Sequence, residues 1–202
     1  MSFEVYFDCS SPWTYLGFHN VQPMAERLGV AIDWKPILVG GVFNTVNQSV
    51  YEQRANPVRA KARYMVKDMQ DWAKLAGLQI KFPPSIFPIN SVKAMRTCIA
   101  IQRTEPEKMV PFAKRVFEVY WSEDGDIANE AVLSDCLTHV DVDPEAVFAA
   151  IQTDEIKAEL RENTQTLIDR GGFGSPTFFV DGRMFFGNDR LSLVEAALTN
   201  TI

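Results

Sequence analysis

The feature that most constrains the fold is an apolar strand that runs directly into a helix start. Residues 3–8 predict a buried β-strand, and Ser11 and Pro12 follow it closely. A serine at the N-cap position accepts a free backbone N–H, and a proline at the first helical position loses no hydrogen bond. We therefore expect a helix over residues 12–28 that ends at Gly29, a residue suited to the left-handed conformation.

A second strand is predicted over residues 30–38, and the helix between the two strands predicts that they pair in parallel. Residues 40–49 are rich in glycine and polar side chains, and predict a flexible loop. Beyond them the chain carries helical periodicity and no strand signal. Helices are expected over residues 59–77, 91–103, 111–121, 130–140, 144–151 and 154–170.

The chain returns to β-structure near its end. Residues 177–180 and 183–186 predict a hairpin, because Asp181-Gly182 between them is a strong two-residue turn. A final helix is expected after this hairpin, with Asn188 or Asp189 as its N-cap.

The order β-α-β, helices, β-β-α predicts an α/β protein. We expect a thioredoxin-like fold interrupted by a large all-α insertion. The predicted thioredoxin-like domain comprises residues 1–41 and 169–202, and the predicted helical insertion domain comprises residues 42–168. A chain of 202 residues is long enough to bury a substantial core in such an arrangement.

Composition narrows the classes of partner. The net charge of −6 argues against nucleic acid. No apolar run approaches the roughly 18 residues of a membrane span, and the N-terminus carries no signal-peptide pattern, so we expect a cytoplasmic protein without a membrane partner. The spacing of Cys9, Cys98 and Cys136 predicts neither a disulfide framework nor a metal site.

The first candidate site is the strand-to-helix junction. Thioredoxin-type proteins place a reactive cysteine pair there, because the helix N-terminus favours the thiolate. Here the residues are Ser11-Pro12-Trp13-Thr14, without sulfur. This predicts a site that stabilises the thiolate of a bound thiol such as glutathione, with the Ser11 hydroxyl donating to the sulfur. The alternative is that Ser11 is only an N-cap.

Two further motifs lie near the end of the chain. Ser175-Pro176 precedes the first hairpin strand, where a thioredoxin-like fold holds a cis-proline that lets a peptide-like ligand pair with the Ser175 backbone. A trans-proline at a strand start is the alternative. Asn188-Asp189 is expected at a helix N-terminus, where free N–H groups bind a carboxylate and Asp189 binds an amino group, or where the pair is a plain cap.

The chain resembles the 2-hydroxychromene-2-carboxylate isomerases and the similar kappa-class glutathione transferases, within the disulfide-oxidase-like thioredoxin superfamily. The resemblance covers essentially the whole chain. It rests on Tyr6-Phe7-Asp8 through Ser11-Pro12 and Tyr15-Leu16, on Asp68, Trp72 and Phe82-Pro83, on Ala94-Met95-Arg96, and most specifically on the segments 172–180 and 186–190.

The resemblance implies roles for single residues. Ser11 matches the family's serine that contacts the glutathione sulfur. Ser175, before Pro176, matches the residue that binds the cysteinyl backbone. Asn188 and Asp189 match the pair that holds the γ-glutamyl group, and glutathione is the implied cofactor.

Some positions are near matches to the family pattern or depart from it. Asn47 is the nearest match to an asparagine that contacts glutathione from the loop after the second strand. Cys9 and Ser10 stand where many members have an apolar residue or phenylalanine, which makes Ser10 a rival candidate for the active hydroxyl. Trp13 replaces the more usual phenylalanine or tyrosine, so the substrate pocket is expected to differ.

The implied activity is a glutathione-dependent isomerisation of an aromatic-derived, unsaturated 2-oxo acid. The thiolate would add to an unsaturated carbon, allow bond rotation or ring opening, and leave. Trp13, Tyr15 and Phe43 are expected to line the substrate pocket. The resemblance also implies a homodimer.

Other functions compete with this one. A kappa-like transferase would release a glutathione conjugate, and a non-catalytic protein would bind glutathione without turnover. A thiol-disulfide oxidoreductase is disfavoured because Ser11 and Thr14 replace the two cysteines.

Overall fold

The computed structural model describes residues 1–202, and its first three elements form the predicted β-α-β unit. Strand β1 (Phe3–Phe7) leads into helix α1 (Pro12–Leu28), and strand β2 (Asp33–Pro36) follows. Strand β2 is shorter than the predicted 30–38, and before its start Val30 completes the C-terminal cap of α1. The Val30 N–H donates to the Ala25 carbonyl at 3.0 Å, and Gly29 takes the left-handed φ of 64°.

The sheet has four strands in the order β2-β1-β3-β4. Strands β1 and β2 are parallel, whereas β3 (Thr177–Val180) pairs antiparallel with both β1 and β4 (Arg183–Phe186). The predicted turn joins β3 to β4, with positive φ at both Asp181 and Gly182. The chain therefore has the predicted thioredoxin-like sheet.

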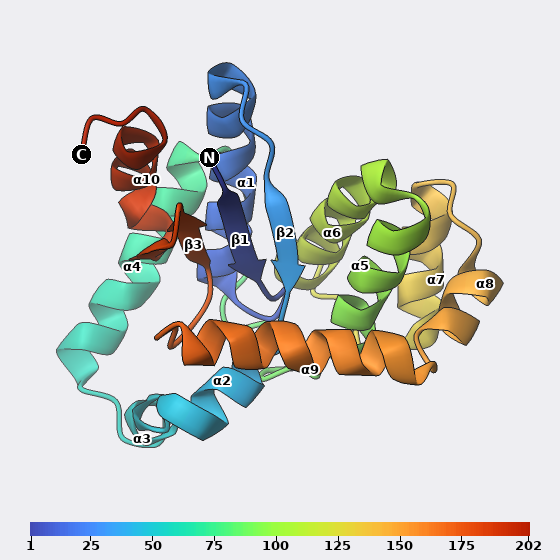
Figure 1. The fold of residues 1–202 in the computed structure, drawn as a ribbon. Helices are drawn as coiled ribbons and strands as arrows, with labels where there is room; N and C mark the ends of the chain where they lie inside the picture. Colours follow the sequence, from blue (N-terminus) through green and yellow to red (C-terminus); the bar gives the residue numbers. More distant parts are fainter.

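Helices supply all elements between β2 and β3. In Figure 1, α5–α8 form a group beside β2, α4 and α10 lie on the side of β3, and α9 crosses the lower end of the sheet. No helix combines the length and hydrophobicity that a bilayer span requires. The helices are α2 (Val39–Val46), α3 (Ser49–Ala55), α4 (Arg59–Leu75), α5 (Val92–Thr104), α6 (Pro106–Trp121), α7 (Glu130–His139), α8 (Pro144–Ala150), α9 (Asp154–Asp169) and α10 (Leu191–Leu198).

The prediction of a loop over residues 40–49 is wrong, because α2 and the start of α3 occupy this segment. Glycines disfavour a helix, but contacts with residues distant in sequence fix the start of α2. The Val39 N–H donates to the Asp8 carboxylate at 2.8 Å, and the Leu38 N–H donates to the Thr164 hydroxyl at 3.0 Å. The start of α6 also differs from prediction, since the helix begins at Pro106 rather than at residue 111.

The core packs the sheet against both α1 and the helical group. Phe18 of α1 lies 4.4 Å from Trp34 of β2 and 5.2 Å from Phe117 of α6, measured between ring centroids. The Trp121 indole N–H donates to the Cys9 carbonyl at 2.9 Å, so the end of α6 is attached to the end of β1. The larger of two hydrophobic core clusters therefore supports the strand-to-helix junction. The division into the domains 1–41 with 169–202 and 42–168 stays a prediction.

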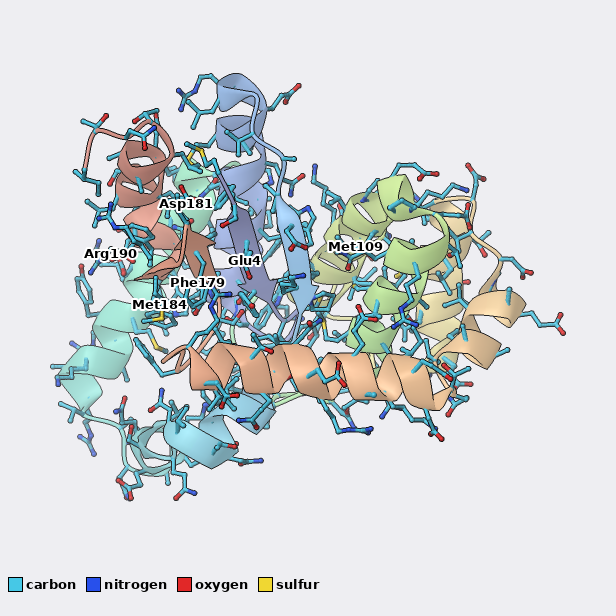
Figure 2. The ribbon with its side chains drawn as sticks, in the orientation of Figure 1. Glu4, Met109, Phe179, Asp181, Met184 and Arg190 are labelled. Atoms are coloured by element: carbon cyan, nitrogen blue, oxygen red, sulfur yellow. The ribbon has the colours of Figure 1, made fainter.

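The residues labelled in Figure 2 lie both on the sheet and at the outer parts of the molecule. Glu4 of β1 and Phe179 of β3 are register partners and lie close together in Figure 2. Met109 of α6 lies in the helical group, far from Arg190 near the start of α10 (Figure 2).

Candidate functional site

The centre of the site is the Ser11 hydroxyl at the N-terminus of α1. Its oxygen accepts the Thr14 N–H at 3.2 Å, so Ser11 is the N-cap that the sequence predicts. The same hydroxyl donates to the Ser175 carbonyl at 3.3 Å, and the Thr14 hydroxyl donates to the Ser175 hydroxyl at 2.8 Å. The two motifs that are distant in the sequence therefore meet at one point.

The segment before β3 offers a free backbone donor beside this point. The Ser175–Pro176 peptide bond is cis. Ser175 is buried, and its N–H donates to no group of the protein. An unpaired donor at the wall of a cavity is a place for a ligand acceptor.

Asp8 fixes the chain segments around the junction. Its buried carboxylate accepts the N–H groups of Ser10 and Val39, both at 2.8 Å, and the Ser91 hydroxyl at 3.1 Å. Burial raises the pKa of Asp8, and the hydrogen bonds from Ser10, Val39 and Ser91 oppose this only in part. The carboxylate thus ties the active-site turn to the starts of α2 and α5. Sequence reasoning gave Asp8 no role, although an aspartate two residues before a serine is a turn signal.

A large cavity of about 500 Å³ opens beside Ser11. Phe82, Phe87, Met69 and Ile89 give it an apolar wall, and Arg54 is the one charged residue that lines it. Four predicted site residues besides Ser11 also line it, namely Trp13, Phe43, Asn47 and Ser175. Ser10 lines it as well.

A smaller cavity of about 340 Å³ is also lined by Trp13. Its lining includes two carboxylates, of Asp68 and Asp189, beside the rings of Trp13, Trp72 and Phe186. Asn188 is buried there: its side-chain oxygen accepts from the Asn20 amide at 2.9 Å, while its own NH₂ group has no partner. The residues that line both cavities are Trp13, Ser175 and Phe186.

Asn47 and Phe43 come from α2 and its end. The Asn47 amide N–H donates to the Phe173 carbonyl at 3.0 Å, which links this helix end to the segment before Ser175. The Phe43 ring packs edge-on against Tyr51 at 6.4 Å between centroids.

Tyr15 lines neither cavity. Its ring is buried and stacks on Phe117 at 5.2 Å, because its position on α1 turns it towards α6. The structure thus places Tyr15 in the core rather than in a substrate pocket. Asn188 and Asp189 also differ from expectation, because they form a short 3₁₀ turn, and α10 begins at Leu191 without a side-chain cap.

Several lining residues were missed or left without a place by sequence reasoning. Asp68 and Trp72 of α4 form part of the smaller cavity, and Arg54 forms part of the larger one. No local pattern marks them, because the segments that surround each cavity are distant in sequence.

The family model described as "DSBA-like thioredoxin domain" matches residues 3–199. The chain therefore belongs to the family of DSBA-like thioredoxin domains. Among its relatives, a 2-hydroxychromene-2-carboxylate isomerase of Sphingobium xenophagum is 26% identical, with 96% of each chain covered. Glutathione S-transferase kappa 1 of Rattus norvegicus is also 26% identical, with 95% of this chain and 88% of the transferase covered.

Solved structures agree with this assignment of the fold. A structure of 2-hydroxychromene-2-carboxylate isomerase superposes with a TM-score of 0.82 at 24% identity, covering 100% of this chain and 96% of the isomerase. The predicted thioredoxin-like fold and the resemblance to the isomerases and kappa transferases are thus confirmed.

Proposed function

We propose that this protein is a glutathione-dependent isomerase that acts on an aromatic-derived, unsaturated 2-oxo acid. One observation carries the proposal: the Ser11 hydroxyl, at a helix N-terminus, lines the larger, apolar cavity and donates to Ser175, which also lines the smaller, acidic cavity. The acidic cavity suits the γ-glutamyl end of glutathione, and the apolar cavity suits an aromatic molecule. The named activities of the isomerase and kappa-transferase relatives support the same reading.

The residues present fit glutathione. The free N–H of Ser175 and its carbonyl would pair with the cysteinyl backbone, beside Pro176. The unpaired NH₂ group of Asn188 would donate to the γ-glutamyl carboxylate. Asp189 and Asp68 would accept from the γ-glutamyl amino group.

Bound glutathione would supply a thiolate nucleophile for reversible addition to an unsaturated carbon, which would allow rotation about the former double bond. The Ser11 hydroxyl would turn from the Ser175 carbonyl and donate to this thiolate. The N-terminus of α1 adds about 0.3–1 kcal/mol of favourable potential when exposed, and up to about 2 kcal/mol when partly buried. Trp13 and Phe43 would hold the aromatic part of the substrate, and Asn47 would contact glutathione.

Calorimetric titration with glutathione tests the cofactor. We expect specific binding by the wild-type protein and weaker binding by Asp189→Ala. Asp135→Ala is the matched control, because Asp135 is an exposed aspartate of α7 outside both cavities. A folded wild-type protein that does not bind glutathione would overturn the proposal.

A kappa-like transferase is the second candidate, because the kappa transferase of rat is as similar as the isomerase of Sphingobium xenophagum. Mass spectrometry of the products separates the two: an isomerised substrate supports the isomerase, and a stable glutathione adduct supports the transferase. Tight binding of glutathione without turnover of any aromatic 2-oxo acid would instead support a non-catalytic binding protein. A homodimer stays a prediction of the resemblance, and a cytoplasmic location stays a prediction from the sequence pattern.

A further inference from the structure

Arg54, in the last turn of α3, is the one charged residue among the 25 that line the larger cavity. Its guanidinium carbon lies 5.7 Å from the Phe43 ring centroid and 5.3 Å from the Phe87 ring centroid. No acidic side chain pairs with Arg54. The cavity thus presents a single positive charge, held between two aromatic rings.

This arrangement orients the guanidinium and leaves its N–H groups without a partner in the protein. Aromatic rings attract an arginine through their faces, and the N–H groups at its edge remain free to bind a planar anion. The paired N–H groups along one edge of a guanidinium form a fork that can bind both oxygens of one carboxylate. Arg170 binds Glu4 in this way, and Arg115 binds Glu123. Arg54 has the same fork and no carboxylate of the protein to fill it.

The surroundings of Arg54 indicate what kind of molecule would bind its guanidinium in the larger cavity. Phe87, Phe82 and Ile89 belong to the apolar wall of the same cavity. An aromatic ring on this wall and one carboxylate on the guanidinium would satisfy both features. A neutral aromatic molecule would leave the cation unpaired, and an amine would be repelled.

We infer that Arg54 anchors the carboxylate of the aromatic substrate in the larger cavity. The inference rests on the proposed function and adds to it the residue that selects an anionic substrate. The glycyl carboxylate of glutathione has the same chemistry and is the competing source. Arg54 does not line the smaller cavity, where the γ-glutamyl end is placed, and it lies against the aromatic rings, which favours the substrate.

The test compares a matched pair of ligands by calorimetry: trans-cinnamate, an aromatic carboxylate, and cinnamamide, its neutral counterpart. Each is titrated with and without saturating S-methylglutathione, which cannot form a thiolate. The variants are Arg54→Met, which removes the charge but keeps the length, and Arg54→Lys, which keeps the charge but loses the fork. Arg59→Met is the control, because Arg59 is an exposed arginine that starts α4 outside both cavities.

We expect the wild-type protein to bind cinnamate more tightly than cinnamamide. Arg54→Met should weaken cinnamate binding about tenfold to a hundredfold, the effect of losing a charge-assisted hydrogen bond. Cinnamamide and S-methylglutathione binding should not change. The affinity of Arg54→Lys for cinnamate should lie between those of the wild type and Arg54→Met. The affinity of Arg59→Met for cinnamate should equal that of the wild type. Circular dichroism checks that each variant is folded.

Two other results would overturn the inference. In the first, the wild-type protein binds the two probes equally or binds neither. In the second, Arg54→Met weakens the binding of S-methylglutathione but not the binding of cinnamate. This result would show that the guanidinium binds the glycyl carboxylate. Failure of the wild-type protein to bind S-methylglutathione would count against the proposed function. The titration of cinnamate in the absence of S-methylglutathione would still decide the role of Arg54.

Discussion

The Ser11 hydroxyl donates a hydrogen bond to the Ser175 carbonyl at 3.3 Å, across 164 positions of sequence. The bond joins the N-terminus of α1 to the segment before β3, the two places where the sequence predicts contacts with a thiol ligand. It also means that the Ser11 proton is shared with the protein itself. A ligand sulfur at this point must compete with the carbonyl for that proton.

Replacing Ser11 by alanine should mainly lower turnover at saturating glutathione. The hydroxyl would donate to a thiolate, and a hydrogen bond to a charged group corresponds to about a tenfold to hundredfold change in rate. The variant should also lose about 1 kcal/mol of stability, since an N-cap is removed. Steady-state kinetics with an aromatic 2-oxo acid measures the first effect. Ser10→Ala is the control, and an equal loss in both variants would leave Ser11 without a special role.

Gly17→Ala should destabilise the protein and weaken glutathione binding together. A Cβ at Gly17 would lie 2.7 Å from Cγ of Pro176 and 3.2 Å from its Cβ, so Pro176 must move. Overpacking of this kind costs about 1–3 kcal/mol. Urea unfolding and calorimetry measure the two effects. At Gly40 of α2 an added Cβ meets no atom within 4 Å, so Gly40→Ala should keep its stability. Unchanged stability of Gly17→Ala would contradict the packing described.

The ion pair between Glu4 and Arg170 should make stability depend on acid pH. Burial raises the pKa of Glu4, but the hydrogen bonds from Arg170 and Tyr6 and the Arg170 charge outweigh this effect, so the pKa of Glu4 lies below its ordinary value. A carboxyl with a lowered folded pKa contributes stability that is present at neutral pH and lost as the pH falls through that value.

Glu4→Gln measures this contribution. The variant should be about 1 kcal/mol less stable at pH 7, because solvent screens a partly exposed pair. The difference should shrink below the pKa of an unpaired glutamate, as Glu4 becomes protonated in the wild type. Urea unfolding at several pH values follows it, with Glu195→Gln as a control at the exposed pair with Arg27. A difference that stays constant with pH would rule out the ion pair as its source.

The elements that the sequence predicts correctly are those with local signals. The N-cap at Ser11, the stop at Gly29 and the Asp181-Gly182 turn each depend on residues within one turn of chain, and the structure has all three. Strand pairing followed from the order of these elements. Local signals also place Ser11 and Ser175 at element ends, where the structure has them.

The missed features depend on contacts between distant segments. Helix α2 forms although it contains two glycines, because the Asp8 carboxylate accepts the N–H of Val39 at the start of the helix. Tyr15 lies in the core because α6 packs beside α1, which no local pattern shows. The surroundings of Arg54 combine Phe43 with Phe87, and only the folded chain brings them together.

The cysteines should be inert in the native protein, which separates this site from a thiol-disulfide oxidoreductase. Cys9, Cys98 and Cys136 are at most 1% exposed. Burial raises the pKa of the Cys9 thiol, and it raises the pKa of Cys136 to about 11, so neither forms the reactive thiolate at neutral pH. Ellman's reagent should therefore detect no thiol in the native protein and all three cysteines after unfolding.

Ser11→Cys is the matched positive control for this experiment. A cysteine at the N-terminus of α1, at the wall of the larger cavity, gains thiolate character from the helix and should react faster than a free thiol. The variant would then show that the junction favours a thiolate which the natural chain does not provide. Rapid labelling of the native wild-type protein, together with reduction of insulin, would instead place a redox-active cysteine in this fold. A Ser11→Cys thiol no more reactive than free cysteine would remove the physical basis for thiolate stabilisation at this site.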